Sequence, residues 1–205
     1  MPPKKNPWLR PGSQTRKTQR IVAFAGKKER SMRSVQAILE KIITLKRAKF
    51  TGHEIEKHYS RRSATKIIRD GFIALSEPYK NRGRVGGCVD YNVVLCSTLR
   101  TIGTPASFVR RKDHSVTRFI LGNKVYEVDP LIEIRNNLLK ESESRNGHSV
   151  YGIPIKPSIY EVTEKIKKRD QKFKREGKFA QGRDAWEIGI RSIKDYSKFD
   201  PKKKS

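Results

Sequence analysis

Apolar residues in segment 31–50 recur with the period of an α-helix, so they share one face of a predicted first helix. Two shorter stretches, 52–60 and 61–72, carry looser apolar edges that predict two further short helices. The apolar face of the first helix consists of Val35, Ile38, Leu39, Ile42 and Leu45, and that of the third of Ile67, Ile68, Phe72 and Leu75.

These three helices allow two interpretations. In a helix-turn-helix, the cations Arg61, Arg62, Lys66 and Arg69 would face phosphates. In the other interpretation, the helices are packing elements of the main domain. We favour the second, because the apolar pattern is loose and no wing follows the helices.

The middle of the chain predicts a helix followed by an antiparallel sheet. Segment 88–103, CVDYNVVLCSTLRTIG, has the pattern of an amphipathic helix that begins at Cys88 and ends at Gly103. Two or three strands are predicted after it, at 106–111, 114–121 and 124–130. Gly122 and Asn123 join the last two strands as a two-residue hairpin turn. A helix followed by antiparallel strands indicates the α+β class.

Both ends of the chain have the composition of basic additions to one domain. Residues 1–30 combine Pro, Gly, Gln, Ser and Thr with basic residues and contain Glu29 as their only acid, which predicts a flexible arm without its own core. Segment 31–155 is then the main domain, including the N-terminal helices. In the basic C-terminal helical extension, 156–205, Ser158 and Glu161 match the S-x-x-E capping box and predict a helix that begins at Ser158.

Length and composition restrict the class of protein. A chain of 205 residues is long enough for one ordinary domain with extensions. It contains no run of about 18 apolar residues, and its N-terminus lacks the apolar segment of a signal peptide, so we expect a cytoplasmic protein without membrane association. The two cysteines, Cys88 and Cys96, would lie about 12 Å apart on one helix, too far for a disulfide, and reduced thiols fit the cytosol.

The net charge of +26 indicates a polyanionic partner. Segment 85–134 contains six basic and five acidic residues, so nearly all of the excess lies outside it. A chain adapted to heat or salt would raise its acids as well, whereas here bases outnumber acids by 47 to 21. We therefore expect the flanks to contact DNA or RNA, or a ribonucleoprotein. The predicted nucleic-acid-binding residues are Lys4, Lys5, Arg10, Arg16, Lys17, Arg20, Lys167, Lys168, Lys172, Lys174 and Arg175.

The hairpin turn determines which residues of the sheet are neighbours. With Gly122 and Asn123 at the turn, Val116 lies opposite Asp129. His114, two positions from Val116, is then the diagonal neighbour of Asp129 on the same face, about 7 to 8 Å away, a gap that an imidazole and a carboxylate can close. The register alone therefore predicts a histidine oriented by a carboxylate.

A thiol is positioned to act with this pair. Cys88 follows Gly86 and Gly87 at the predicted helix start, where free backbone N–H groups and the helix dipole favour the thiolate form. The Cys88 N–H would be one donor to an oxyanion. His114 would accept the thiol proton and return it to a leaving group, while Asp129 would hold the tautomer of the imidazole. Tyr79, Asn81 and Asn92 are candidates for a second oxyanion donor, and Cys96 is expected in the core.

The segments around these residues resemble the transglutaminase-like superfamily of papain-type enzymes. The similar parts are GGCVDYNVVLCSTLRTIGTPASFV, the following His114 and then VYEVDP, all within residues 84–130. The resemblance implies a Cys-His-Asp thiol site for acyl transfer, namely transglutamination, hydrolysis of a protein or peptide, deamidation, or deglycosylation of glycopeptides. We expect no cofactor and no metal, since His53 and His58 are spaced one residue wider than in H-E-x-x-H.

Two hypotheses follow for the function. In the first, the chain is a thiol enzyme that acts on a peptide or amide bond near nucleic acid, with Cys88, His114 and Asp129 as its catalytic residues. In the second, it is a non-catalytic DNA- or RNA-binding protein that uses the same fold as a scaffold. The superfamily includes inactive members, among them domains of eukaryotic nucleotide-excision-repair damage-recognition proteins. The Cys88 thiol is activated in the first hypothesis and ordinary in the second.

Overall fold

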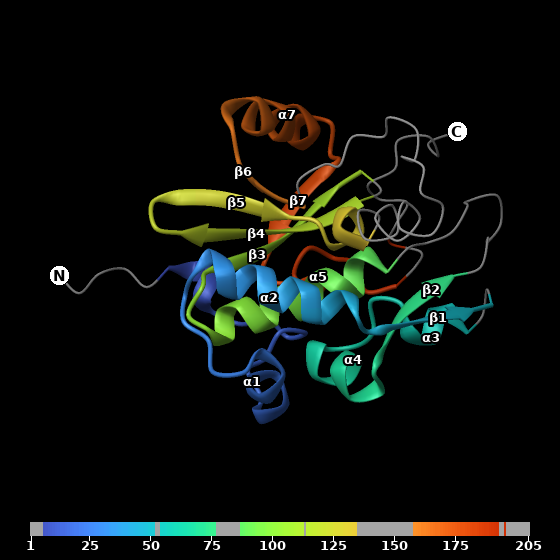
Figure 1. The fold of residues 1–205 in the computed structure, drawn as a ribbon. Coiled ribbons are helices and arrows are strands. Elements are labelled where there is room, and N and C mark those ends of the chain that lie inside the picture. The colour runs from blue at the N-terminus through green and yellow to red at the C-terminus, as the bar shows by residue number, and fades with distance from the viewer. Residues whose placement is uncertain are drawn as a thin grey trace, which may run out of the picture.

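A computed structural model of the chain describes residues 6–51, 54–76, 87–112, 114–134, 158–192 and 195. Its elements are η1 (Pro7–Leu9), α1 (Gln19–Ala25), α2 (Met32–Ile43), β1 (Lys46–Phe50), α3 (Ile55–His58), α4 (Ala64–Asp70), β2 (Phe72–Ser76), α5 (Cys88–Thr101), β3 (Ala106–Arg111), β4 (His114–Leu121), β5 (Lys124–Val128), β6 (Ile159–Glu161), α7 (Glu164–Arg175) and β7 (Phe179–Gly182). A five-stranded antiparallel sheet has the order β6-β5-β4-β3-β7, and a second sheet pairs β1 with β2 in parallel. Helices α2 and α5 lie on one side of the larger sheet and α7 on the other (Figure 1). In this described part of the chain, no helix is long and apolar enough to cross a lipid bilayer.

The central element is α5, which is buried on every side. All of its residues from Cys88 to Arg100 are buried, between β3 and β4 on one side and α1, α2 and α4 on the other. Its bounds agree with the prediction, since it begins at Cys88 and Gly103 follows its last turn in a left-handed conformation, with φ +77°. The predicted amphipathic character is wrong, because helices distant in the sequence cover the face that would otherwise contact water.

The register predicted for the hairpin is confirmed. Leu121 pairs with Lys124 and Thr117 with Val128, as the two-residue turn requires. Gly122 has a φ of +59°, a conformation that favours glycine. With β3 antiparallel to β4 and helices before the sheet, the predicted combination of N-terminal helices and antiparallel strands is present.

The first and third predicted helices are shorter than their patterns. Residues 46–50 form β1 rather than the end of the first helix. The third helix, α4, ends at Asp70 because Gly71 adopts a left-handed φ of +74°, so Phe72 and Leu75 belong to β2. Strands β1 and β2 pair with each other in parallel, although α3 and α4 lie between them in the sequence. The spacing of apolar residues describes only the local segment, so it could not predict this pairing.

Residues 6–30 pack against the rest of the protein, which differs from the predicted flexible arm. Ile21 of α1 is completely buried, and α1 contacts α5 and α4. The Gln14 side chain, 1% exposed, donates hydrogen bonds to the carbonyls of Ser60 (3.0 Å) and Arg62 (3.1 Å). Hydrogen bonds to buried backbone carbonyls therefore attach this segment, although it contains few apolar residues. Amino-acid composition alone could not predict such bonds.

The helix start predicted from Ser158 and Glu161 is wrong. Residues 159–161 form β6 on the edge of β5, and α7 begins only at Glu164. The Ser158 carbonyl accepts a hydrogen bond from the Asp129 N–H (2.8 Å). The edge of β5 offers unpaired backbone groups, and a stretch with Ile and Tyr satisfies them as a strand. Because β7 pairs with β3 at the opposite edge, the C-terminal segment completes the sheet instead of forming a separate helical extension.

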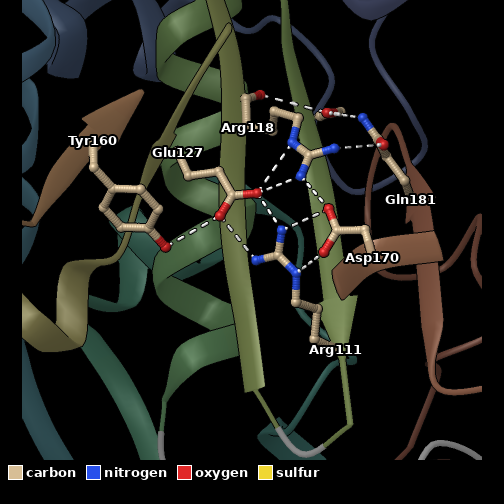
Figure 2. Close-up of polar contacts among 7 residues, drawn as sticks. Arg111, Arg118, Glu127, Tyr160, Asp170 and Gln181 are labelled. Carbon is tan, nitrogen blue, oxygen red and sulfur yellow. Dashed lines mark hydrogen bonds and ion pairs between the residues drawn. The ribbon is translucent and has the colours of Figure 1, made fainter. Parts of the chain in front are cut away.

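A buried cluster of ion pairs joins α7 to the sheet (Figure 2). Arg111 of β3 donates to Glu127 of β5 (Nη1···Oε2, 2.9 Å) and to Asp170 of α7 (Nε···Oδ1, 2.6 Å). Arg118 of β4 contacts the same two carboxylates, with 2.6 Å between its Nη2 and Oδ2 of Asp170. Two guanidinium groups thus oppose two carboxylates, and their charges balance. The cluster also includes Tyr160 of β6 and Gln181 of β7.

The cluster lowers the pKa of its acids. Burial alone would raise the pKa of Glu127 and of Asp170, but the hydrogen bonds and charges of Arg111 and Arg118 outweigh burial and lower both. In acid, the unfolded chain therefore binds more protons than the folded chain. The stability that the cluster contributes is present above the ordinary carboxyl pKa and is lost as the pH falls through the lowered values.

Replacing Glu127 by Gln should lower the free energy of unfolding by about 3 kcal/mol at neutral pH, because two buried guanidinium groups would then share one carboxylate. Urea unfolding followed by circular dichroism measures this loss. The control is Glu164→Gln, which removes an exposed partner of Lys167 and should change stability little. The difference between wild type and Glu127→Gln should shrink in acid, where the wild-type carboxylate is also protonated. A loss no larger than that of the control would contradict the role of the cluster.

Candidate active site

Cys88 is the first residue of α5, and Gly87 caps the start of the helix. A Cβ atom at position 87 would lie 2.1 Å from Cγ2 of Ile73 on β2, far inside contact distance. Glycine therefore lets β2 pack directly against the helix start, which determines where the thiol lies relative to both sheets. The N–H groups that a helix directs out of its first turn, together with the helix dipole, favour an anion at this position.

Asp90 attaches the first turn of α5 to β2 and α4. Its buried carboxylate accepts a hydrogen bond from the Ala74 N–H (3.0 Å) and pairs with the guanidinium of Arg62. Arg62 also contacts Asp70 at the end of α4 (3.4 Å), and its guanidinium carbon lies 4.3 Å from the centre of the Phe72 ring. Because Arg62 is 1% exposed, it cannot face a phosphate as the helix-turn-helix interpretation required.

Asn92 attaches the same turn to β4. Its amide nitrogen donates to the carbonyls of Cys88 (2.7 Å) and Ser115 (2.9 Å), and its oxygen accepts from the Thr117 hydroxyl (2.7 Å). Since both amide hydrogens are engaged, Asn92 is removed from the three candidates for a second oxyanion donor. The other predicted donors, Tyr79 and Asn81, lie outside the described residues, as does Gly86.

His114 and Asp129 are in contact, as the hairpin register predicts. The distance between Nε2 of His114 and Oδ2 of Asp129 is 2.6 Å. Burial would lower the pKa of His114, but its hydrogen bonds to Asp129 and Cys88 and the charges of those groups outweigh burial and raise it to about 10. The imidazole thus contacts both the thiol and the carboxylate, and it is protonated at neutral pH.

A further cation at the thiol, Arg110 of β3, was not predicted. Its side chain is completely buried, and its Nη1 lies 3.1 Å from Oγ of Ser115 and 3.8 Å from Sγ of Cys88. Alternation along the strand from the buried Phe108 is a signal that points Arg110 toward the core. That signal is weak, because arginine is almost never buried unless another group pairs with it. The sequence did not indicate which group would pair with Arg110.

Cys96 lies in the core, as predicted, two turns after Cys88 on the same helix. It is completely buried, and burial raises the pKa of its thiol. No charged group of the candidate site is among its hydrogen-bond partners in the described residues; its sulfur contacts the Thr117 hydroxyl at 3.5 Å. Cys96 therefore serves as an internal reference for the reactivity of Cys88.

The predicted nucleic-acid-binding cations lie in solvent wherever the structure describes them. On α7, Asp170 is buried and Ile166 and Phe173 are half-buried, so one face of the helix contacts the sheet and the other faces present cations. This helix and α5, whose first residue is Cys88, lie on opposite sides of the larger sheet (Figure 1). Lys4 and Lys5 lie outside the described residues. The exposed cations are Arg10, Arg16, Lys17, Arg20, Lys167, Lys168, Lys172, Lys174 and Arg175.

Comparison with known proteins supports the fold at a coarse level. No family model matches the chain, and no curated protein matches it. A solved structure from Cytophaga hutchinsonii, described as a candidate cysteine protease, is similar with a TM-score of 0.50 and 15% sequence identity. The likeness covers 90% of this chain and 48% of that chain, so this chain spans about half the length of the protein that it matches. At this identity the likeness shows a cysteine-protease-like fold and nothing about activity.

Gly87→Ala should destabilise the protein, because the added methyl group overlaps Ile73 and forces β2 away from the start of α5. Overpacking of this kind costs about 1–3 kcal/mol. Ile73→Ala removes the colliding group and is itself destabilising through the cavity that it leaves. The double variant should nevertheless lose less stability than the sum of the two single losses. Urea unfolding of the wild type and the three variants measures this coupling, and strictly additive losses would contradict the contact.

Proposed function

We propose that the chain is a transglutaminase-like thiol protein that transfers or hydrolyses an acyl group at a peptide or amide bond. Cys88 is the nucleophile, His114 the acid and base, and Asp129 the residue that orients the imidazole. One observation carries the proposal. The His114 imidazole contacts both the Cys88 side chain and the Asp129 carboxylate, at the N-terminus of a buried helix.

The proposed reaction has two steps. The Cys88 thiolate attacks the amide carbonyl carbon, and the oxygen of the resulting tetrahedral intermediate becomes negative near the Cys88 N–H. Protonated His114 gives its proton to the departing nitrogen, the C–N bond breaks, and a thioester and a free amine remain. Neutral His114 then takes a proton from water or from an amine acceptor, which attacks the thioester carbonyl. The C–S bond breaks, the sulfur leaves as a thiolate, and the imidazole is protonated again.

One observation favours a second candidate, a non-catalytic scaffold. Cys88 is only 2% exposed, so a substrate carbonyl reaches the sulfur only after neighbouring groups move. In this candidate function, Cys88, His114 and Asp129 stabilise the fold and the chain acts through its surface. The two candidates differ in whether Cys88 reacts as an activated thiol.

In either case, we propose that α7 is the surface that associates with DNA, RNA or a ribonucleoprotein. The supporting observation is that the cations of α7 are exposed and outnumber its acids. Asp170 is buried and paired with Arg111 and Arg118, and the exposed Glu164 pairs with Lys167. Phosphates bound there would lie on the side of the larger sheet away from α5 (Figure 1). Binding should therefore be independent of the thiol.

Cys88 should react with iodoacetamide faster than Cys96 at neutral pH, because His114 and the helix start favour its thiolate whereas burial raises the pKa of Cys96. Mass spectrometry of the two cysteine peptides measures both rates in one sample. His114→Ala should lower the alkylation rate of Cys88 by about tenfold or more and leave the alkylation rate of Cys96 unchanged. Since His114 stays protonated up to about pH 10, its contribution should persist in weakly alkaline solution and be lost above that pH. A Cys88 rate that does not respond to His114→Ala would favour the scaffold.

Reversing Lys167, Lys168 and Lys172 to Glu should weaken binding to duplex DNA, because these exposed side chains lie on the proposed contact surface. Fluorescence anisotropy at several salt concentrations measures the affinity. In the wild type, the logarithm of the affinity should fall by about 0.9 per neutralised phosphate for each tenfold rise in salt. The triple variant should lose roughly one unit of this slope for each lysine that contacts a phosphate.

The matched control reverses three exposed lysines on β1 and α3, namely Lys46, Lys49 and Lys57, which changes the net charge equally. Equal losses in the two triple variants would assign the binding to overall charge and not to α7. Cys88→Ala should leave the affinity unchanged. No binding at low salt would remove nucleic acid from the proposed function.

A further inference from the structure

Arg110 and Cys88 belong to one hydrogen-bonded framework. Nη1 of Arg110 lies 3.8 Å from Sγ of Cys88 and donates to the hydroxyl of Ser115 (3.1 Å), the residue directly opposite Arg110 in the sheet. The Ser115 carbonyl accepts from Asn92, whose amide also donates to the Cys88 carbonyl. All four residues are almost completely buried. Packing and these hydrogen bonds therefore fix the position of the guanidinium relative to the sulfur, unlike in a flexible pair on the surface.

Charged groups of the described residues near Cys88 come from different parts of the fold. Arg110 comes from β3, His114 from β4, its partner Asp129 from the end of β5, and Asp90 from the first turn of α5. The Asp90 carboxylate is paired with the guanidinium of Arg62, which offsets its charge. The sulfur thus has two cations beside it that differ in kind: a guanidinium keeps its charge at every ordinary pH, whereas an imidazolium can lose its proton.

We infer that Arg110 stabilises the Cys88 sulfur as a thiolate independently of the charge on His114. The inference rests on the proposed thiol reaction and adds a residue to it. When the thioester is cleaved, His114 must be neutral to take the proton of the attacking water, and the sulfur departs as a thiolate. A permanent cation 3.8 Å from that sulfur stabilises the departing thiolate whether the imidazole is neutral or charged at that moment.

The pH dependence of Cys88 alkylation in the full chain tests this inference. Arg110→Gln keeps a polar side chain but removes the charge, so the midpoint of the Cys88 profile should rise by about 1 to 2 pH units. Arg110→Lys should restore most of the wild-type midpoint. The matched control is Arg118→Gln, which removes a largely buried guanidinium whose partners, Glu127 and Asp170, lie on the α7 side of the sheet. It should lower stability without moving the midpoint.

The outcomes separate this inference from the proposed function. A higher midpoint in Arg110→Gln, unmatched by Arg118→Gln, supports the inference. If His114→Ala raises the midpoint and a folded Arg110→Gln does not, the inference is overturned and the proposed function stands; if neither variant moves it, both are overturned.

A second variant covers the case in which Arg110→Gln fails to fold, as judged by circular dichroism. Ser115→Ala keeps the arginine and removes the hydroxyl that fixes it. The midpoint should then rise by a smaller amount in the same direction. An unchanged midpoint in folded Ser115→Ala would overturn the inference.

Discussion

The candidate site depends on how the first turn of α5 is held between the two sheets. Asp90 attaches this turn to the backbone of β2, and Asn92 attaches it to the backbone of β4. Gly87 permits the direct contact with β2 that the first attachment requires. His114 belongs to the larger sheet, so the distance between thiol and imidazole is determined by these attachments and not by the chemistry of the pair. A variant that kept Cys88, His114 and Asp129 but lost either attachment would not keep the geometry of the site.

The scarcity of acids explains both the interior and the surface of this protein. Inside, carboxylates neutralise Arg62, Arg111 and Arg118, because a buried charge that loses its partner is strongly destabilising. Acids used in this way are not available to offset lysines and arginines outside. The excess of 47 bases over 21 acids is therefore expressed mainly at the surface. The interior pairs join Asp90 to Arg62, Asp129 to His114, and Glu127 and Asp170 to Arg111 and Arg118.

The features that sequence reasoning predicted correctly are those determined by neighbouring residues. Gly122 sets the hairpin register, and the register alone brings His114 beside Asp129. The features that it missed depend on partners distant in the chain. The capping-box pattern at Ser158 is one that starts helices, but the edge of β5 was free to pair, and residues 159–161 form a strand there instead. The burial of Arg110 depends on a helix and a strand that meet only in the folded state, so no local rule could predict it.

The larger sheet lies between α5 and α7, and adjacent residues of β3 contact groups on its two sides (Figure 1). Arg110 contacts Cys88 on the α5 side, whereas Arg111 contacts Asp170 on the α7 side, as alternation along a strand requires. A polyanion bound to the outer face of α7 would have the larger sheet between it and α5, but Arg111, which joins β3 to α7, lies directly opposite His114 in the sheet. The charge-balanced cluster opposes movement of α7 relative to the sheet, because shifting the helix would separate buried ion pairs. The cluster therefore fixes α7 on the sheet and, through Arg111, connects the strand that carries Arg110 to the strand that carries His114.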